Sequence, residues 1–170
     1  PGAIDAQLLA LREFGTKSAA EVMAPALELA DGMPLDEMRA GAISYSRRFF
    51  ELWPDAMKMF MPGGKRPIIG EVFQQTDLAR TMRGMIEAER KAKASGLKRE
   101  AAIDAMRDYF YRGEPARKID AFMKSNVGLL RYEDMAAFRL KVEEPVQGTY
   151  KGLKVYKPGF ELSASEDGGK

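Results

Sequence analysis

Three adjacent carboxylate pairs are the first candidates for acid–base or metal chemistry in this sequence: Glu133-Asp134, Glu143-Glu144 and Glu166-Asp167. Carboxylates can act as general acids and bases, or bind hard cations such as Ca²⁺. Neighbouring residues on a helix or strand point in different directions, however, so sequence proximity alone makes no pair converge on one site. The first pair also falls where a helix is expected to begin, and negative charge is favourable there without any catalytic role. We therefore expect all three pairs to be structural.

The 170 residues include neither cysteine nor histidine. The lack of cysteine excludes disulfides, thiolate nucleophiles and cysteine metal sites, and the lack of histidine removes the commonest general base near neutral pH. Carboxylates, lysines and hydroxyls remain for any chemistry. On this basis we assign no catalytic, cofactor-binding or metal-binding residue, and we expect no cofactor.

Two segments rich in cations invite an anion-binding interpretation. Pro62-Gly63-Gly64-Lys65-Arg66 lacks the longer glycine spacing and the Lys-Ser/Thr pair of a phosphate loop, so a surface turn is the better interpretation. The run 90–99 could bind nucleic acid or an anionic membrane, in which case a strongly salt-dependent gel shift is expected. Glu87 and Glu89 dilute its charge, and no aromatic residues stand among the cations for base stacking. We favour the solvated face of a helix.

The overall composition is that of an ordinary globular domain. Charged residues make up 31% and hydrophobic residues 45%, and 27 basic residues against 25 acidic ones leave a net charge of +2. This balance argues against a broad phosphate-binding surface. No apolar run approaches the length of a membrane span, and the first residues carry neither the basic nor the apolar part of a leader. We therefore expect neither nucleic acid nor membrane as a partner.

Apolar spacing predicts a mainly helical fold. Helices are expected over residues 3–14, 18–29, 35–50, 76–95, 114–126 and 132–138, with a further helical face defined by Ile103, Met106 and Phe110. The helix from Ser18 is expected to be capped by that residue, and to be divided or kinked at Pro25. Its inward residues are predicted to be Val22, Met23, Ala26 and Leu29. Asp31–Pro34 has the composition of a turn.

The helix that begins near Thr76 has the strongest amphipathic pattern. Thr76 is the expected N-cap, so Thr76→Ala should cost about 1 kcal/mol. Gly84 lies inside this helix and should itself cost about 1 kcal/mol relative to alanine.

The pattern changes after residue 138. Alternating β-branched and aromatic residues over Val142–Tyr156 predict a hairpin that turns near Lys151-Gly152. We expect three parts: a helical domain over residues 1–138 with a loop at 62–70, a β hairpin over 139–160, and a flexible tail over 161–170. The hairpin's unpaired edges make it a site of either mobility or homodimer formation.

Several motifs occur together in the order known from one enzyme family. Phe60-Met61-Pro62-Gly63-Gly64, Gly70-Glu71 and Gln75–Thr81 resemble the middle of the large subunit of the gamma-glutamyltransferases (gamma-glutamyltranspeptidases). These enzymes cleave gamma-glutamyl amides such as glutathione. Further matching stretches, covering most of residues 1–160, are Pro1-Gly2-Ala3, Glu21–Ala26, Tyr109–Gly113, Gly128–Leu130, Glu133–Phe138 and Gly148–Gly152. Arg131 departs from the pattern, because family members often have threonine or serine there, so the helix cap is expected to be weaker or shifted.

The resemblance implies a helical segment of an N-terminal nucleophile hydrolase of the αββα type. In that family the nucleophile is a threonine that becomes the first residue of the small subunit, and its own α-amine serves as the base. None of the threonines here, Thr16, Thr76, Thr81 and Thr149, stands in the processing motif. The arginine that holds the substrate carboxylate lies upstream of the matching segment. After Phe160 the sequence no longer resembles the continuation of the family.

The resemblance therefore implies a scaffold that is inactive alone. Its implied partners are the remainder of the large subunit and the small catalytic subunit, with gamma-glutamyl substrate bound only in the complete enzyme. The alternative is a free-standing helical module that binds a protein partner through the stretch Met57–Met61.

Overall fold

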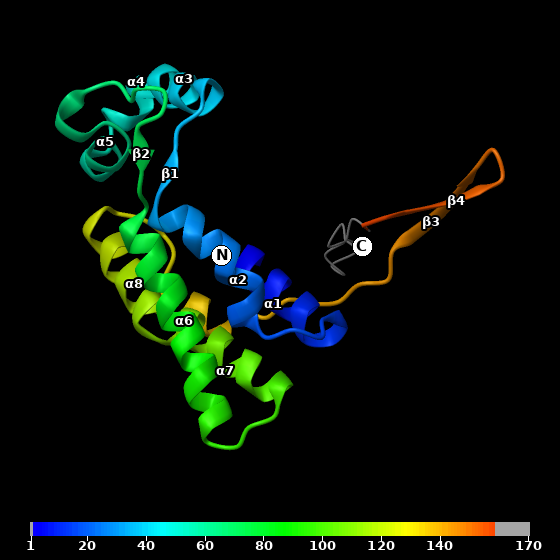
Figure 1. Ribbon diagram of the computed structural model, residues 1–170. Coiled ribbons are helices and arrows are strands. Elements are labelled where there is room, and N and C mark those ends of the chain that lie inside the picture. The colour runs from blue at the N-terminus through cyan, green and yellow to red at the C-terminus, as the bar shows by residue number, and fades with distance from the viewer. Residues whose placement is uncertain (1, 159–170) are drawn as a thin grey trace, which may run out of the picture. The chain divides into compact units, whose positions relative to one another are not determined.

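Residues 2–158 are described by a computed structural model, and they confirm a mainly helical chain with a small C-terminal β hairpin (Figure 1). The helices are α1 Gly2–Phe14, α2 Ala19–Asp31, α3 Glu37–Tyr45, α4 Arg47–Phe50, α5 Pro54–Phe60, α6 Thr76–Ala94, α7 Arg99–Arg112, α8 Glu114–Ser125 and α9 Tyr132–Ala137, with a 3₁₀ turn at Pro62–Gly64. The strands are β1 Met33–Pro34, β2 Val72–Phe73, β3 Val146–Tyr150 and β4 Leu153–Lys157. The chain divides into two compact units, and the boundary falls between Phe138 and Arg139.

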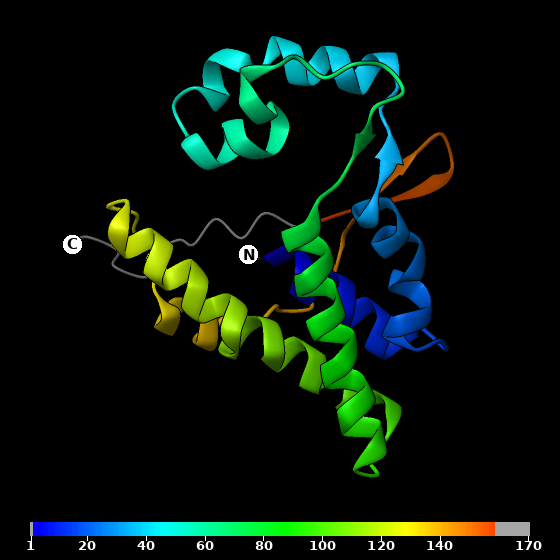
Figure 2. The ribbon, with the colours of Figure 1, turned by 60° about the vertical axis from the view of Figure 1, so that its left-hand side comes forward.

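A helix hairpin formed by α6 and α7 is the centre of the first unit (Figures 1 and 2). Its turn uses Gly96 at φ +87°, a conformation that glycine adopts without strain. Helices α1 and α2 pack against the hairpin, and α8 packs against α7. The main core cluster joins α1, α2, α6 and α7 through the side chains of Leu8, Ala19, Met85, Ile103 and Met106. The predicted face of α7, with Ile103, Met106 and Phe110, is therefore confirmed as the face that packs inward.

Helix α2 begins at the predicted residue, but the face of the helix that packs inward differs from the prediction. Ser18 forms a capping box with Glu21, in which each side chain accepts the other residue's backbone N–H. The helix runs through Pro25 as one element, so it is not divided there, and a kink at Pro25 stays a prediction. Val22 and Leu29 are more than half exposed and Ala26 is also exposed, which makes three of the four predicted inward residues wrong. The inward face consists of Ala19, Met23, Leu27 and Ala30.

The start of α6 also differs from the prediction. Thr76 is the first helical residue, and the N-cap position belongs to Gln75, which makes no side-chain capping bond. The backbone N–H of Gln75 donates instead to the carbonyl oxygen of Ala30, at 2.8 Å. The cap that motivated a cost for Thr76→Ala is therefore absent from this helix.

A second group of elements is inserted between α2 and α6. The segment predicted as a turn at 31–34 contains β1, which pairs antiparallel with β2 and leads the chain out to α3, α4 and α5 and back (Figure 2). Phe60 stacks between Phe50 and Phe73, with ring centroids 4.6 and 5.7 Å away. Met61, the residue after α5, is 1% exposed. Aromatic stacking therefore stabilises this group of elements, from β1 to β2, which has little regular sheet. We call the group the inserted lobe.

Helix α9 begins with a cap that the sequence did not predict. A carboxylate oxygen of Asp134 accepts the backbone N–H of Arg131 at 2.8 Å, and Asp120 accepts that of Tyr132 at 3.1 Å. The cap expected to be weak is thus supplied by acidic residues. Met135 packs beneath this helix with Tyr111 and Ala116, and all three are fully buried.

The second unit contains the β3–β4 hairpin, whose strands pair from Val146↔Lys157 to Tyr150↔Leu153. The turn lies at Lys151 and Gly152, as predicted, and both residues have positive φ there. Dimer formation through the hairpin edge stays a prediction, and the tail predicted over 161–170 lies outside the described residues.

Gly84 gives the first testable stability prediction. A Cβ atom at this position would collide with the hydroxyl end of the Tyr109 ring on α7. Gly84→Ala is therefore expected to lower the free energy of unfolding by about 1–2 kcal/mol, because overpacking outweighs the better helix propensity of alanine. Chemical denaturation checks this against Gly41→Ala on α3, where a Cβ meets no atom within 4 Å and a gain is expected. Stabilisation by both substitutions would show that α6 and α7 are not closely packed at Gly84.

Candidate functional site

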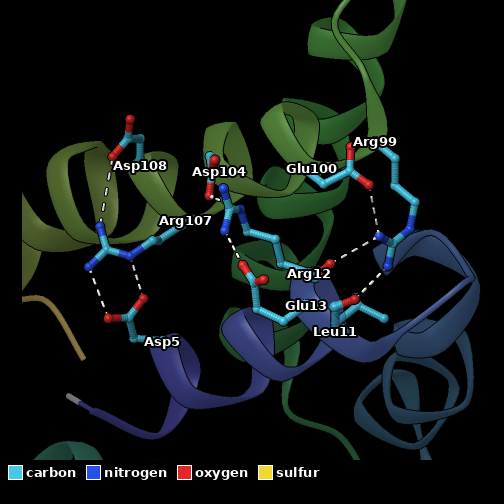
Figure 3. Close-up of polar contacts among 9 residues, drawn as sticks. All are labelled: Asp5, Leu11, Arg12, Glu13, Arg99, Glu100, Asp104, Arg107 and Asp108. Atoms are coloured by element: carbon cyan, nitrogen blue, oxygen red, sulfur yellow. Dashed lines mark hydrogen bonds and ion pairs between the residues drawn. The ribbon is translucent and has the colours of Figure 1, made fainter. Parts of the chain in front are cut away.

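The fold brings four charged residues into contacts between helices: Asp5, Glu89, Arg99 and Arg107. We call these four residues, with their contacts to α1 and α2, the polar seam. Figure 3 shows its α1–α7 part. Arg107 on α7 donates through Nε and through one terminal nitrogen to the two carboxylate oxygens of Asp5 on α1. Their side chains are 11% and 5% exposed, so this bidentate pair is shielded from water. It ties the first turn of α1 to the middle of α7.

Further contacts complete the surroundings of this pair. Arg107 donates to the carbonyl oxygen of Phe138 at 2.6 Å, and its guanidinium lies 4.8 Å from the centre of the Tyr111 ring. The Tyr111 hydroxyl accepts the backbone N–H of Asp5 at 3.1 Å. The bond to Asp5 raises the pKa of Arg107, and burial raises the pKa of the Tyr111 hydroxyl. Both groups therefore keep their protonated form at neutral pH.

Arg99 holds the C-terminal end of α1 (Figure 3). Its guanidinium donates to the backbone carbonyl oxygens of Leu11, Arg12 and Lys17, the last two at 3.2 and 3.1 Å. Carbonyl groups at a helix C-terminus lack intrahelical partners and carry partial negative charge. A cation placed here therefore satisfies the end of α1 and the loop that follows it.

Glu89 has the opposite role at the N-terminus of α2, where its carboxylate accepts backbone N–H groups. Its two carboxylate oxygens accept the backbone N–H groups of Ala19 and Ala20 at 3.1 and 3.0 Å, and Lys93 pairs with it at 2.8 Å. Glu89 is 1% exposed. The α6–α7 hairpin thus caps two helix ends from a distance, with a carboxylate for α2 and a guanidinium for α1.

The structure does not bring the predicted acidic pairs together as sites. Asp134 serves as a cap while Glu133 is exposed beside it, and Glu143 and Glu144 are exposed in the second unit. The pair at 166–167 lies outside the described residues. Within residues 2–158 no group of three acidic residues is arranged to hold a metal ion.

The two cation-rich segments have structural environments. Pro62–Gly64 is an exposed 3₁₀ turn with Gly63 and Gly64 at positive φ, and it does not open a helix. In the basic run, Arg90 and Lys91 pair with Glu87, Lys93 pairs with Glu89, and Arg99 binds backbone carbonyls. Most of these cations are therefore engaged within the chain.

An apolar groove of about 800 Å³ lies between α5, the start of α6 and α8. Its apolar lining residues Trp53, Met59, Leu78 and Phe122 are 53%, 42%, 46% and 45% exposed. Met59 lies in this groove, but Met61 is buried, so the predicted contact stretch Met57–Met61 is not one exposed surface. None of the helices in residues 2–158 is both long and apolar enough to span a bilayer.

Sequence reasoning missed the members of the polar seam as a group. A signal existed for Glu89, which interrupts the apolar face of α6 one turn after Met85. A signal also existed for Asp5, which lies beside Ile4 on a helix face that packs inward. No local pattern marks Arg99 or Arg107, because their partners on α1 lie more than 80 residues away. Chemically, the seam fixes helices relative to one another and presents no free nucleophile.

Comparison with known proteins shows what this chain is similar to. The profile of the gamma-glutamyltranspeptidase family matches residues 1–165. The acylase ACY 1 proenzyme of Pseudomonas sp. (strain SE83) is 30% identical over 159 residues, which are 93% of this chain and 25% of that protein. The glutathione hydrolase proenzyme of Escherichia coli (strain K12) is 27% identical over 92% of this chain and 24% of its own length.

A solved structure agrees with these sequence matches. Helicobacter pylori gamma-glutamyltranspeptidase superposes with a TM-score of 0.79 at 27% identity, over 94% of this chain and 41% of that one. The chain spans about a quarter of the length of the curated relatives it matches. Because the family profile covers nearly the entire sequence, this chain belongs to the gamma-glutamyltranspeptidase family.

Proposed function

We propose that this chain is the helical scaffold segment of the large subunit of a gamma-glutamyltransferase-like enzyme. In the complete protein, that enzyme hydrolyses or transfers the gamma-glutamyl group of peptides such as glutathione. The observation that carries the proposal is the family match over residues 1–165 combined with coverage of only a quarter of the relatives. In this proposal residues 1–138 form a helical domain, and the hairpin over 139–160 joins the catalytic core.

The contacts of the charged residues support a scaffold role. The polar seam uses its carboxylates and guanidinium groups to hold helix ends and helix pairs, so these groups are engaged by partners within the chain. The Thr81 hydroxyl, on α6, donates to the backbone carbonyl of Asp77 at 3.0 Å. A nucleophilic hydroxyl would instead need a base within hydrogen-bond reach. We therefore assign the reacting groups to the remainder of the large subunit and to the small catalytic subunit.

The relatives also bear on the choice of substrate. One is named an acylase and another a glutathione hydrolase, and their identities to this chain are 30% and 27%. A segment that is similarly related to both does not by itself select the acyl group. Substrate choice in our proposal therefore belongs to the parts of the enzyme outside this segment.

The activity prediction is that the purified chain alone does not release the chromophore from a chromogenic gamma-glutamyl anilide. The measurement is the absorbance of the released aniline, with Helicobacter pylori gamma-glutamyltranspeptidase as the positive control. Circular dichroism of the same sample must show the helical content, so that a negative result reports a folded chain. Release above the buffer rate by the folded chain would overturn the scaffold role.

The apolar groove favours a second candidate function, a free-standing module that binds a protein partner. Four half-exposed apolar side chains around one hollow form the kind of surface that binding partners cover. The native open reading frame separates the two candidates. A threonine in the family's processing motif downstream of this segment would support the enzyme scaffold, and a stop codon soon after residue 170 would support the module.

A further inference from the structure

One face of the α3–α4 helical run is apolar and open to solvent. Met38, Tyr45, Phe49 and Leu52 are 74%, 88%, 67% and 71% exposed. Met38, Tyr45 and Phe49 are spaced by seven and four residues, so at about 100° per residue they fall in one stripe along the helix, and Leu52 follows in the turn after α4. We define these four residues, with Gly41 and Ala42 between them, as the outer stripe.

The run behaves as nearly one helix, so the stripe is a continuous surface. The single residue between α3 and α4 is Ser46, whose N–H donates to the carbonyl of Ala42 at 3.0 Å. Its own carbonyl accepts the N–H of Phe50 at 3.2 Å, as in an α-helix, and that of Phe49 at 2.9 Å, as in a 3₁₀ turn. The opposite side is already occupied, because Ala40 is buried and Phe50 stacks on Phe60. The outer stripe therefore has no partner within the inserted lobe.

Small residues occupy the centre of the stripe. Gly41 and Ala42 are both exposed, and a Cβ added at Gly41 would meet no atom within 4 Å. Larger apolar side chains lie on either side of them, at Met38 and Tyr45. A centre of small residues lets the backbone of another helix approach closely, while the larger side chains pack beside it. The surface therefore has the shape of a helix-packing seam.

The charged residues beside the outer stripe indicate which molecule would pack against it. Arg39 pairs with Asp36 and Arg47 pairs with Glu51, whereas Glu37 and Arg48 have no ion pair in the part of the chain that is described. Glu37 and Arg48 flank the same edge of the stripe, about 20° apart around the helix. Their midpoint lies between Ala42 and Ile43, next to the small residues. A two-fold axis through this point places Glu37 of one copy beside Arg48 of the other, twice.

We propose that a second copy of this chain docks on the outer stripe, with the two α3–α4 runs packed antiparallel around Gly41 and Ala42. The apolar side chains supply the buried area, and the two symmetry-related Glu37–Arg48 pairs fix the direction and register. A single helix pair is small for an interface, so the dimer is weak and reversible. This dimer does not depend on the scaffold function proposed above.

Charge reversal tests the proposal through sedimentation equilibrium over a wide range of concentrations. Glu37→Arg and Arg48→Glu are each expected to weaken the dimer about tenfold, because two exposed pairs become repulsive. The double variant restores both pairs in reversed order and should return to within a few-fold of the parent. Glu28→Arg on α2 and Arg66→Glu in the loop after Pro62–Gly64 make the same changes in charge outside the stripe, and should leave the dimer unchanged.

A third variant tests the apolar part of the seam. Tyr45→Asp places a charge on the stripe at a residue that is 88% exposed, so it should abolish the dimer while the circular dichroism spectrum stays the same. A parent chain that is monomeric at every concentration would overturn the proposal. So would a dimer that is indifferent to Glu37, Arg48 and Tyr45, and that result would direct attention to the β3–β4 hairpin instead.

Discussion

Replacing Arg107 with alanine is expected to destabilise the helical unit by about 3–5 kcal/mol. The substitution leaves the Asp5 carboxylate buried at 3% exposure without its cation, and it removes the donor to the Phe138 carbonyl. The loss of the bidentate cation is the costly part, because a buried carboxylate cannot recover that interaction from water. Denaturant unfolding followed by circular dichroism measures the change.

Two further variants show whether burial is the cause. Arg112→Ala breaks an ion pair with Asp108 on the same helix, where both side chains are about half exposed, and a 3.3 Å hydrogen bond to the Ala136 carbonyl. It should cost only about 1 kcal/mol. The double variant Asp5→Leu with Arg107→Met replaces the buried pair by apolar groups, and it should recover most of the loss. Equal effects of Arg107→Ala and Arg112→Ala would contradict the assignment of the pair as a buried link.

The helices themselves could be predicted because their signals are local. The apolar spacing of Met82, Met85, Ile103 and Met106 reports the core face of α6 and α7 directly, and Ser18 with Glu21 marks the start of α2 within four residues. The hairpin turn at Lys151-Gly152 is local in the same sense. Where the determinant of a structure lies within one or two helical turns, the residues alone are sufficient.

The inward face of α2 could not be chosen from its own sequence. Val22, Ala26 and Leu29 have a helical spacing as good as that of Met23, Leu27 and Ala30, and the second set is selected by contact with Ala79 and Met82 of α6. The pairing of Met33 with Phe73 is likewise set by residues far away in the chain. The same holds for the polar seam, where Arg107 and Asp5 are separated by 102 positions. Long-range partners decide these features, so single-sequence patterns leave them open.

Removing the carboxylate of Glu89 is expected to be the second most damaging single change. Glu89→Ala leaves the N–H groups of Ala19 and Ala20 without their acceptor at the start of α2, and it leaves Lys93 without its partner. Hydrogen bonds to a charged group contribute about 1.5–3 kcal/mol each, while relief from burying the carboxylate offsets part of that sum. We therefore expect a net loss of about 2–4 kcal/mol in the free energy of unfolding.

Local hydrogen exchange distinguishes this long-range cap from a general weakening of α6. If Glu89 caps α2, the amides of residues 19–22 should lose protection in Glu89→Ala well before those in the middle of α6. Glu89→Gln keeps one carbonyl acceptor and should fall between the parent and the alanine variant. Glu87→Ala, two residues earlier and exposed, removes the ion pairs with Arg90 and Lys91 and should leave the protection of α2 unchanged. Uniform loss of protection across α2 and α6 in Glu89→Ala would mean that the carboxylate stabilises α6 itself and not the start of α2.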